Sequence, residues 1–159
     1  MDRIGIGTDI HRLVAGKPLI IGGVQIESDL GADGHSDADV LLHAITDAVL
    51  GALALGDIGS HFPNSDERWR GAESSKFLAY AAGLVRKQGF QITNIDSTVS
   101  LESPKLQPFI HEMRVSIAAA AQIDLAQVSV KAKTGEGVDA VGERRAIRAD
   151  AVVLITKNR

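Results

Sequence analysis

The sequence predicts an α+β fold in which a mixed β-sheet carries its helices packed on one face. Alternating segments at both ends of the chain are typical of strands, and amphipathic segments between them are typical of helices. Strands and helices do not alternate strictly, so no doubly wound or barrel fold is indicated. At 159 residues the chain suits a single domain covering residues 1–159. The second sheet face needs cover, so we expect a homo-oligomer.

Five segments are expected to form strands, because apolar and polar residues alternate in them or β-branched residues are frequent. They are residues 3–11, a hairpin within 18–26, and residues 90–101, 128–133 and 146–155. The hairpin is predicted to turn at Gly22-Gly23. In the third segment, Ile95, Val99 and Leu101 are expected to share one face.

Three segments are expected to form helices: residues 38–55, 74–88 and 104–121. Ser36 and Asp39 match the Ser-x-x-acid pattern of a helix start, and Gly56 marks the end of the first helix. Pro108 suits a first helical position, so the third helix is expected to form properly only from there. The first helix is apolar nearly all round, which predicts burial on several sides and hints at a subunit interface. Residues 57–71 are expected to form a polar loop.

Composition argues against several classes of protein. The formal net charge is −3 and aromatic residues make up 4% of the chain, so a nucleic-acid binder is not expected. No apolar stretch approaches about 20 residues, so we expect no membrane segment. The absence of cysteine favours a reducing compartment, and the N-terminus lacks the pattern of a signal peptide. We therefore expect a cytoplasmic protein.

Asp9 and His11 are the first candidate metal ligands. Residues two apart on a strand point to the same side, so a carboxylate oxygen and an imidazole nitrogen can meet one ion there. Asp and His both suit zinc, and a third ligand must then come from elsewhere. The alternative is two polar residues that face water at a strand end.

His43 is the candidate third ligand, because it is a polar residue in an otherwise apolar predicted helix. Asp39 and Asp47 lie one turn before and after it on the same face. Either carboxylate could accept the second imidazole N–H and fix the tautomer. The alternative is a core histidine satisfied by Asp47. With Asp9 and His11, three protein ligands and one open position describe a catalytic zinc site.

Two further segments suit a phosphorylated ligand. His35-Ser36 precedes the first predicted helix, where backbone N–H groups favour an anion; the alternative is that Ser36 only caps the helix. In the turn after residues 128–133, Thr134 offers a hydroxyl and Glu136 offers an oxygen ligand for Mg²⁺ or Mn²⁺. The alternative there is an ordinary polar turn.

Two loops are candidates for substrate contacts. Ser103-Pro104-Lys105-Leu106 forms a stiff turn that presents one lysine, and residues 56–66 form a loop near the first helix. Taken alone, the first is better explained as a helix-start turn with a solvated lysine, and the second is only a loop.

In this order the segments resemble the 2-C-methyl-D-erythritol 2,4-cyclodiphosphate synthase family over essentially the whole chain. The resemblance is carried by Gly7-Thr8-Asp9-Ile10-His11, residues 34–40, 43–48 and 55–59, Phe62-Pro63, Pro104-Lys105-Leu106 and Lys131-Ala132-Lys133-Thr134. The block from Gly34 to Gly59 is the most specific part. The chain departs from the common family pattern Thr-Thr-x-Glu at Lys133, in the run Lys133-Thr134-Gly135-Glu136, and again at Ala140 and Glu143 in the region that lines the trimer cavity of many relatives.

The resemblance implies a homotrimer around a central sheet-lined cavity, with active sites between adjacent subunits. The implied reaction converts 4-diphosphocytidyl-2-C-methyl-D-erythritol 2-phosphate to the 2,4-cyclodiphosphate and releases CMP, a step of non-mevalonate isoprenoid biosynthesis. Zn²⁺ or another divalent cation would be held by Asp9, His11 and His43, and Mg²⁺ or Mn²⁺ by Glu136 with the substrate diphosphate. His35 and Thr134 would stabilise the transition state.

The resemblance also assigns two groups of substrate contacts. The methylerythritol phosphate is expected at Asp57, Ile58, Gly59, Phe62, Pro63, Asn64, Ser65 and Asp66. The cytidine is expected at Leu101, Ser103, Pro104, Lys105, Leu106, Gln107, Ala132 and Lys133. Ser36 and Gly135 complete the set.

Two other functions fit the same ligands. A zinc hydrolase would cleave a phosphoester with metal-bound water. A trimeric binding protein would use zinc only to join strand to helix. Thr134, Glu136 and Lys105 favour the synthase, because a structural zinc site requires none of them.

Overall fold

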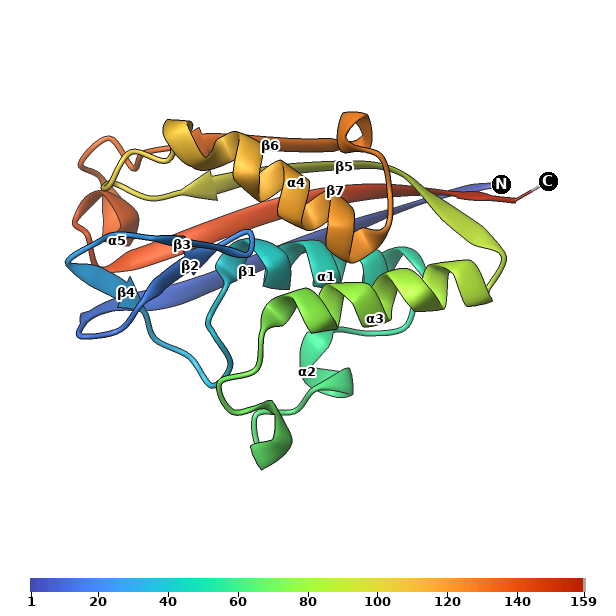
Figure 1. Ribbon diagram of the computed structural model, residues 1–159, viewed down its shortest axis with the longest axis horizontal. Helices are drawn as coiled ribbons and strands as arrows, with labels where there is room; N and C mark the ends of the chain where they lie inside the picture. Colours follow the sequence, from blue (N-terminus) through green and yellow to red (C-terminus); the bar gives the residue numbers. More distant parts are fainter. Residues whose placement is uncertain (159) are drawn as a thin grey trace.

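The computed structural model describes residues 1–158 and contains a five-stranded mixed sheet in the order β4-β1-β7-β5-β6 (Figure 1). Its strands are β1 Asp2–Ala15, β4 Leu30–Ala32, β5 Phe90–Ser100, β6 Val128–Lys133 and β7 Ala146–Lys157. The predicted hairpin is confirmed as β2 Leu19–Ile21 paired with β3 Val24–Ile26. Its turn uses Gly22 and Gly23, whose φ angles of 59° and 76° favour glycine.

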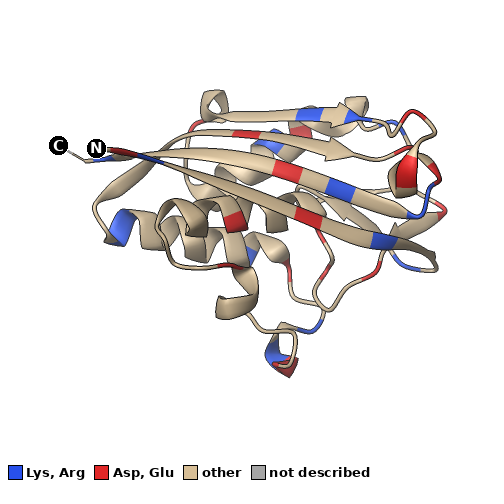
Figure 2. Cartoon of the chain, turned by 180° about the vertical axis from the view of Figure 1, so that it is seen from behind, with Lys and Arg blue, Asp and Glu red and all other residues tan. Residues whose placement is uncertain are grey.

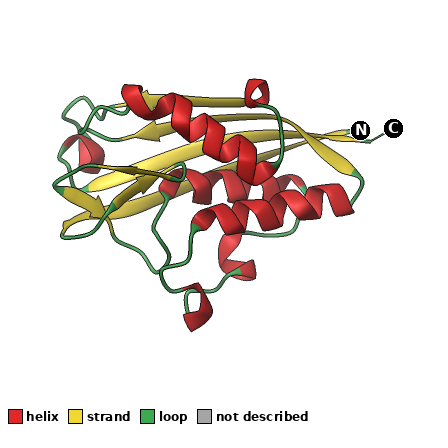
Figure 3. Cartoon of the chain, viewed as in Figure 1, coloured by secondary structure: helices red, strands yellow, loops and turns green. Residues whose placement is uncertain are grey.

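The longer helices lie together on one side of the sheet, as the sequence predicts (Figures 1 and 3). The helices are α1 Val40–Ala52, α2 Ile58–His61, α3 Ser74–Lys87, α4 Ile110–Ala121 and α5 Asp139–Gly142. Short 3₁₀ turns are η1 Glu67–Trp69, η2 Gln107–Phe109 and η3 Leu125–Gln127. The segment predicted as a plain loop thus contains α2 and η1, which are too short to show a helical period in the sequence.

Strand β7 forms the centre of the sheet. It pairs antiparallel with β1, from Asp2 opposite Thr156 to Arg12 opposite Ala146, and antiparallel with β5 on its other edge. Strand β6 pairs parallel with β5, and α4 lies in the connection between them. Parallel neighbours need such a crossover, which is why the sheet is mixed.

Helix α1 is buried within its own chain. It packs on β1 and β7 on one side and on α3 on another, and Leu41, Leu42 and Ile45 have no exposed surface. Its prediction as a helix buried on several sides is therefore confirmed. The hint that its apolar surface marks a subunit interface is wrong, because the sheet and α3 already cover it.

Asp39, and not Ser36, caps α1. The Asp39 carboxylate accepts the Leu42 N–H at 3.0 Å, whereas Ser36 lies outside the helix and accepts the Ala38 N–H at 3.3 Å. Asp39 also accepts the N–H groups of Gly22 and Gly23, at 2.9 and 2.7 Å. One buried carboxylate thus joins the helix start to the hairpin turn.

The opposite face of the sheet carries no helix (Figure 2). Ile4, Ile6 and Ile10 of β1 point to this face with 72%, 71% and 58% of their surface exposed, and Val152 of β7 adds 45%. The same face also carries two ion pairs, Lys131 with Asp96 and Arg148 with Asp150. We call it the apolar sheet face after its exposed isoleucines, and it is where the sequence predicts a second copy. None of the helices within residues 1–158 is both long and apolar enough to cross a membrane.

Candidate metal centre

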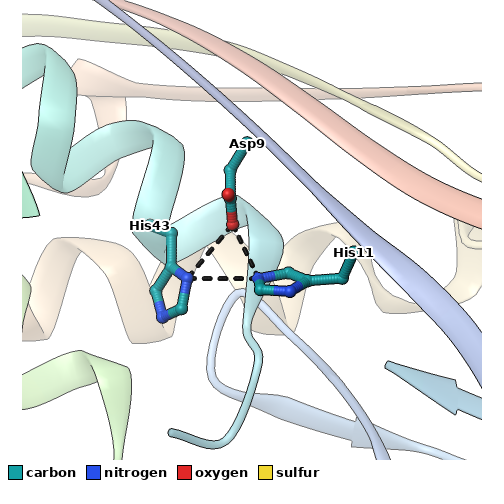
Figure 4. A group of neighbouring side chains, drawn as sticks. All are labelled: Asp9, His11 and His43. Atoms are coloured by element: carbon teal, nitrogen blue, oxygen red, sulfur yellow. Dashed lines mark hydrogen bonds and ion pairs between the residues drawn. The ribbon is translucent and has the colours of Figure 1, made fainter. Parts of the chain in front are cut away.

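The three predicted zinc ligands meet at one point. Asp9 and His11 project from the same side of β1, and His43 projects toward them from the first turns of α1 (Figure 4). Asp9 Oδ2 lies 2.8 Å from His11 Nε2 and 3.1 Å from His43 Nδ1, and the two nitrogens lie 3.3 Å apart. They form the group of metal-ligating side chains found among the described residues.

The spacing of these three atoms fits a zinc-sized ion. Tetrahedral coordination with bonds of about 2.0–2.1 Å places ligand atoms about 3.3 Å apart. The observed separations of 2.8 to 3.3 Å approach that value, so a small outward movement is enough to admit the ion. Two nitrogens and one carboxylate oxygen are also a catalytic zinc donor set.

The electrostatics of the group favour a cation. Burial raises the pKa of Asp9, but hydrogen bonds from His11 and His43 outweigh burial and lower this pKa to about 2. Burial lowers the pKa of His11, but the hydrogen bond and charge of Asp9 outweigh it and raise this pKa. Asp9 is therefore an ionised ligand that attracts positive charge from either a proton or a metal.

His11 is oriented by a backbone carbonyl. Its Nδ1 lies 3.0 Å from the carbonyl oxygen of Asp33, which can only accept a hydrogen bond. In the neutral imidazole, an N–H on Nδ1 leaves the lone pair of Nε2 free to bind an ion between Asp9 and His43. This arrangement is the usual way in which a ligating histidine is held.

The prediction that Asp47 or Asp39 orients His43 is wrong. Asp47 accepts the Ile58 N–H at 2.7 Å, and Asp39 is committed to the helix cap and the hairpin. The Nε2 atom of His43 instead lies 2.8 Å from Ser74 Oγ and 3.1 Å from Ser36 Oγ. Ser74 was missed because it is 31 residues away at the start of α3, and spacing along one helix cannot reveal such a contact.

The metal-ligand group lies in a cavity of about 370 Å³. Six residues predicted by the resemblance line it: His35, Ser36, Ile58, Gly59, Phe62 and Asn64. Asp33, Gly34, Trp69 and Phe77 also line it and were not predicted. Among the described residues, His35 Nε2 and Trp69 Nε1 are buried without a hydrogen-bond partner, so this wall has two ring nitrogens unpaired.

Four predicted residues of the same loop do not line the cavity: Asp57, Pro63, Ser65 and Asp66. The Asp57 carboxylate caps α2 through the Ser60 N–H at 2.9 Å. Asp66 caps η1 and pairs with Arg68 at 2.6 Å. These two carboxylates hold the loop in shape, a role that the sequence shows only weakly through the Asx pattern.

The remaining predicted residues form a separate group at the ends of β5 and β6. Leu101 N–H donates to the Lys133 carbonyl at 2.9 Å, and Gly135 N–H donates to the Glu102 carboxylate at 2.8 Å. Leu101 and Leu106 are each only 3% exposed, so these side chains belong to the core. The other members at this strand end are Ser103, Pro104, Lys105, Gln107, Ala132, Thr134 and Glu136.

This second group does not line the cavity of the metal ligands within one chain. Two strand spacings separate β1 from β5, because β7 lies between them. At about 4.8 Å a strand, that is about 10 Å before any side chain is counted. The structure therefore brings together the three metal ligands, His35 and the Ile58–Asn64 wall, and leaves Thr134 and Glu136 apart from them.

Known proteins are similar to this chain in both sequence and fold. A family model described as the YgbB family matches residues 2–156. The bifunctional enzyme IspD/IspF of Albidiferax ferrireducens is 57% identical over 98% of this chain, but the chain spans only 37% of that protein. The 2-C-methyl-D-erythritol 2,4-cyclodiphosphate synthase of Solibacter usitatus is 50% identical over 98% of both chains.

A solved structure of a 2C-methyl-D-erythritol-2,4-cyclodiphosphate synthase superposes with a TM-score of 0.89 at 40% identity, covering 97% of this chain and 100% of the other. The match extends over the strand and helix that carry the three metal ligands. On sequence and fold together, this chain belongs to the YgbB family, the family of its synthase relatives.

Proposed function

We propose that this protein is a cyclising, CMP-releasing phosphorus–oxygen lyase. It converts 4-diphosphocytidyl-2-C-methyl-D-erythritol 2-phosphate to 2-C-methyl-D-erythritol 2,4-cyclodiphosphate. The observation that carries the proposal is the convergence of Asp9, His11 and His43 in a cavity walled by His35 and the Ile58–Asn64 loop. The synthase relative that matches over 98% of both chains supports the choice of substrate.

The reaction is an intramolecular phosphoryl transfer. An oxygen of the 2-phosphate attacks the diphosphate phosphorus nearer the erythritol, a new phosphorus–oxygen bond forms, and the bond to CMP breaks. The attacking phosphate is already ionised, so no strong general base is required. Positioning of two anionic groups and neutralisation of their charge are the main tasks of the protein.

Asp9, His11 and His43 would hold Zn²⁺ or another divalent cation. Such an ion, when bound, polarises a phosphoryl oxygen and offsets the repulsion between the two phosphates. His35 lies on the cavity wall with Nε2 unpartnered, which suits donation to a phosphoryl oxygen. Ser36, Ile58, Gly59, Phe62 and Asn64 would surround the methylerythritol, with Asp57, Pro63, Ser65 and Asp66 shaping that loop.

The second group of residues would come from an adjacent subunit of a homotrimer. Thr134 would stabilise the transition state, and Glu136 would help to hold Mg²⁺ or Mn²⁺ against the diphosphate. Residues 101–107, together with Ala132, Lys133 and Gly135, would receive the cytidine. Lys105, Gln107, Lys133, Thr134 and Glu136 are all exposed in the single chain, which suits a role at a contact between copies.

The oligomer would form through the apolar sheet face, with the three sheets around a central cavity. Ile4, Ile6 and Ile10 are exposed on this face, and contact with another copy would bury them. The whole of residues 1–159 would act as one domain in the cytoplasm. A nucleic-acid partner is not proposed, because the formal net charge is −3.

The test is phosphorus NMR of purified protein with the diphosphocytidyl substrate, Zn²⁺ and Mg²⁺. The synthase yields CMP and a cyclic diphosphate, and His43→Ala yields neither. CMP with a linear product would indicate a hydrolase instead. No turnover by a trimer that holds zinc would overturn the enzyme assignment and favour a binding protein.

A further inference from the structure

A chain of hydrogen bonds leads from the metal centre to the start of α3. His43 Nε2 lies 2.8 Å from Ser74 Oγ, and Ser74 Oγ lies 2.5 Å from Asp37 Oδ1. Ser74 has no exposed surface, so its hydroxyl is shielded from bulk water, and Asp37 is half-buried. Neither Ser74 nor Asp37 lines the cavity of the metal ligands.

The direction of each bond follows from the groups involved. The Asp37 carboxylate accepts every hydrogen bond that its side chain makes here: from Ser74 Oγ, from the Ser74 N–H and from the Asp39 N–H. A carboxylate only accepts, so the Ser74 hydroxyl proton points to Asp37. The Ser74 oxygen then presents lone pairs to His43, which donates from Nε2.

This direction settles the tautomer that binds a metal. A neutral imidazole carries one N–H, so an N–H on Nε2 leaves the Nδ1 lone pair free. That Nδ1 is the atom 3.1 Å from Asp9 Oδ2 and 3.3 Å from His11 Nε2. The chain of bonds therefore turns the correct nitrogen of His43 toward the ion.

Asp37 also holds Ser74 in place. Glu73 stands at the N-cap position of α3 but makes no side-chain cap bond. Asp37 Oδ2 supplies the cap instead by accepting the Ser74 N–H at 3.0 Å, and the Asp37 N–H donates to the Ala72 carbonyl at 3.1 Å. Backbone and hydroxyl of Ser74 are thus fixed by the same carboxylate.

Ser36 is a second acceptor for the same N–H. Its hydroxyl oxygen lies 3.1 Å from His43 Nε2, farther than that of Ser74. Ser36 has no carboxylate partner that would fix the direction of its own proton. Removal of the Ser74 hydroxyl therefore leaves Ser36 as a weaker acceptor for the His43 N–H. A change at Asp37 instead alters the direction in which the Ser74 hydroxyl proton points.

We propose that Asp37 and Ser74 are positioning residues that set the tautomer of His43 for metal binding. The proposal rests on the metal site of the proposed function and adds to it a link between α3 and the metal. In Asp37→Asn the side-chain amide can donate to Ser74 Oγ, which turns the hydroxyl proton toward His43 and favours the wrong tautomer. The loss of a carboxylate behind a catalytic histidine acts in this way in the serine-protease triad.

The test measures Zn²⁺ affinity by competition with a chelator, beside urea unfolding of the metal-free proteins. Asp37→Asn is expected to weaken Zn²⁺ binding about 10- to 100-fold, and Ser74→Ala by a smaller factor. Glu73→Gln removes the neighbouring carboxylate, which makes no cap bond, and is expected to leave the affinity unchanged. In zinc-loaded protein with ¹⁵N-labelled histidine, the His43 Nε2–H should exchange with water faster in Ser74→Ala.

The outcomes separate the two proposals. A wild-type protein that binds no Zn²⁺ would overturn the metal site itself. Wild-type binding with equally tight binding by Asp37→Asn would overturn only the positioning role. If Asp37→Asn does not fold, the double variant Ser36→Ala/Ser74→Ala tests the proposal instead. It removes both hydroxyl acceptors of the His43 N–H and keeps the Asp37 cap of α3. An undiminished Zn²⁺ affinity of this double variant would contradict the proposal.

Discussion

Gly7 of β1 packs directly against the backbone of Ala44 in α1: a Cβ atom on Gly7 would lie 1.9 Å from the Ala44 carbonyl oxygen. Gly5 stands in the same relation to Ala48, at 1.7 Å. Gly5, Gly7, Asp9 and His11 share one face of β1 because they alternate along the strand. His43 immediately precedes Ala44. The close contact between β1 and α1 therefore determines the distance from His43 to Asp9 and His11.

Gly7→Ala is therefore expected to lower the free energy of unfolding by about 3 kcal/mol or more and to weaken Zn²⁺ binding. The new methyl group meets backbone, which cannot rotate away, and the helix must move outward. Gly83→Ala in α3 is the matched control. A Cβ there meets nothing within 4 Å, so the change should be neutral or stabilising by up to about 1 kcal/mol. Urea unfolding that gives equal stabilities for both variants would contradict the close contact.

The buried cap of α1 predicts a pH dependence. Burial raises the pKa of Asp39 to about 6, although the N–H groups of Leu42, Gly23 and Gly22 lower it. Because the folded state binds this proton more tightly than the unfolded state, the contribution of Asp39 to stability is complete below pH 3.8 and is lost as the pH rises through about 6. The difference corresponds to about 3 kcal/mol at about 1.4 kcal/mol for each pKa unit.

Asp39→Asn removes this titration and keeps the shape of the side chain. The stability of the wild type relative to Asp39→Asn should therefore fall between pH 4 and pH 7, which urea unfolding at several pH values measures. Other carboxylates contribute equally to both proteins and cancel in the difference. A difference that does not change with pH would show that the bound N–H groups cancel the effect of burial on this pKa, and a difference that rises with pH would show that they outweigh it.

Zinc is expected to stabilise the protein through its three ligands. At a free Zn²⁺ concentration about 100 times the Kd, the free energy of unfolding should rise by about 2.7 kcal/mol. The increase should vanish in His43→Ala and in Asp9→Asn. His111→Ala removes an exposed histidine of α4 and should show the same stabilisation by zinc as the wild type. Equal stabilisation of His43→Ala would mean that zinc binds elsewhere.

The elements that the sequence predicts correctly have strong local patterns. Strand β5 alternates so that Ile95 and Val99 are fully buried, and Asp9 and His11 are close because a strand places alternate residues on one side. The helix α1 follows from a long apolar segment. In each case the signal is contained within a few neighbouring residues.

The errors concern contacts between segments that are distant in the sequence. Ser36 and Asp39 both resemble a helix cap, and the choice depends on where the Gly22-Gly23 turn lies. The partner of His43 depends on where α3 begins, and α3 is placed by packing against α1 and α4. Periodicity along one helix suggested Asp47, whose carboxylate is held by Ile58 instead.

The apolar sheet face predicts how the proposed oligomer can be broken. Ile6→Lys places a charge without a partner among the exposed isoleucines of β1, where its desolvation opposes association. The variant should elute as a monomer in size-exclusion chromatography with light scattering. Val115→Lys adds the same charge at an exposed valine of α4, on the helix side. This variant should keep the oligomer mass of the wild type. An unchanged mass of Ile6→Lys would place the subunit contacts elsewhere.

The proposed division of the site between subunits predicts complementation. His43→Ala lacks one metal ligand and Glu136→Ala lacks the proposed second-metal ligand, so each homotrimer should be inactive. In mixed trimers, formed by unfolding and refolding the two variants together, some contacts join an intact metal-ligand group to an intact Glu136. Random mixing in equal amounts makes about one quarter of the sites intact, and activity should recover to about that fraction of the wild type. If each site used only residues of one chain, no mixed trimer would contain an intact site and no activity would return.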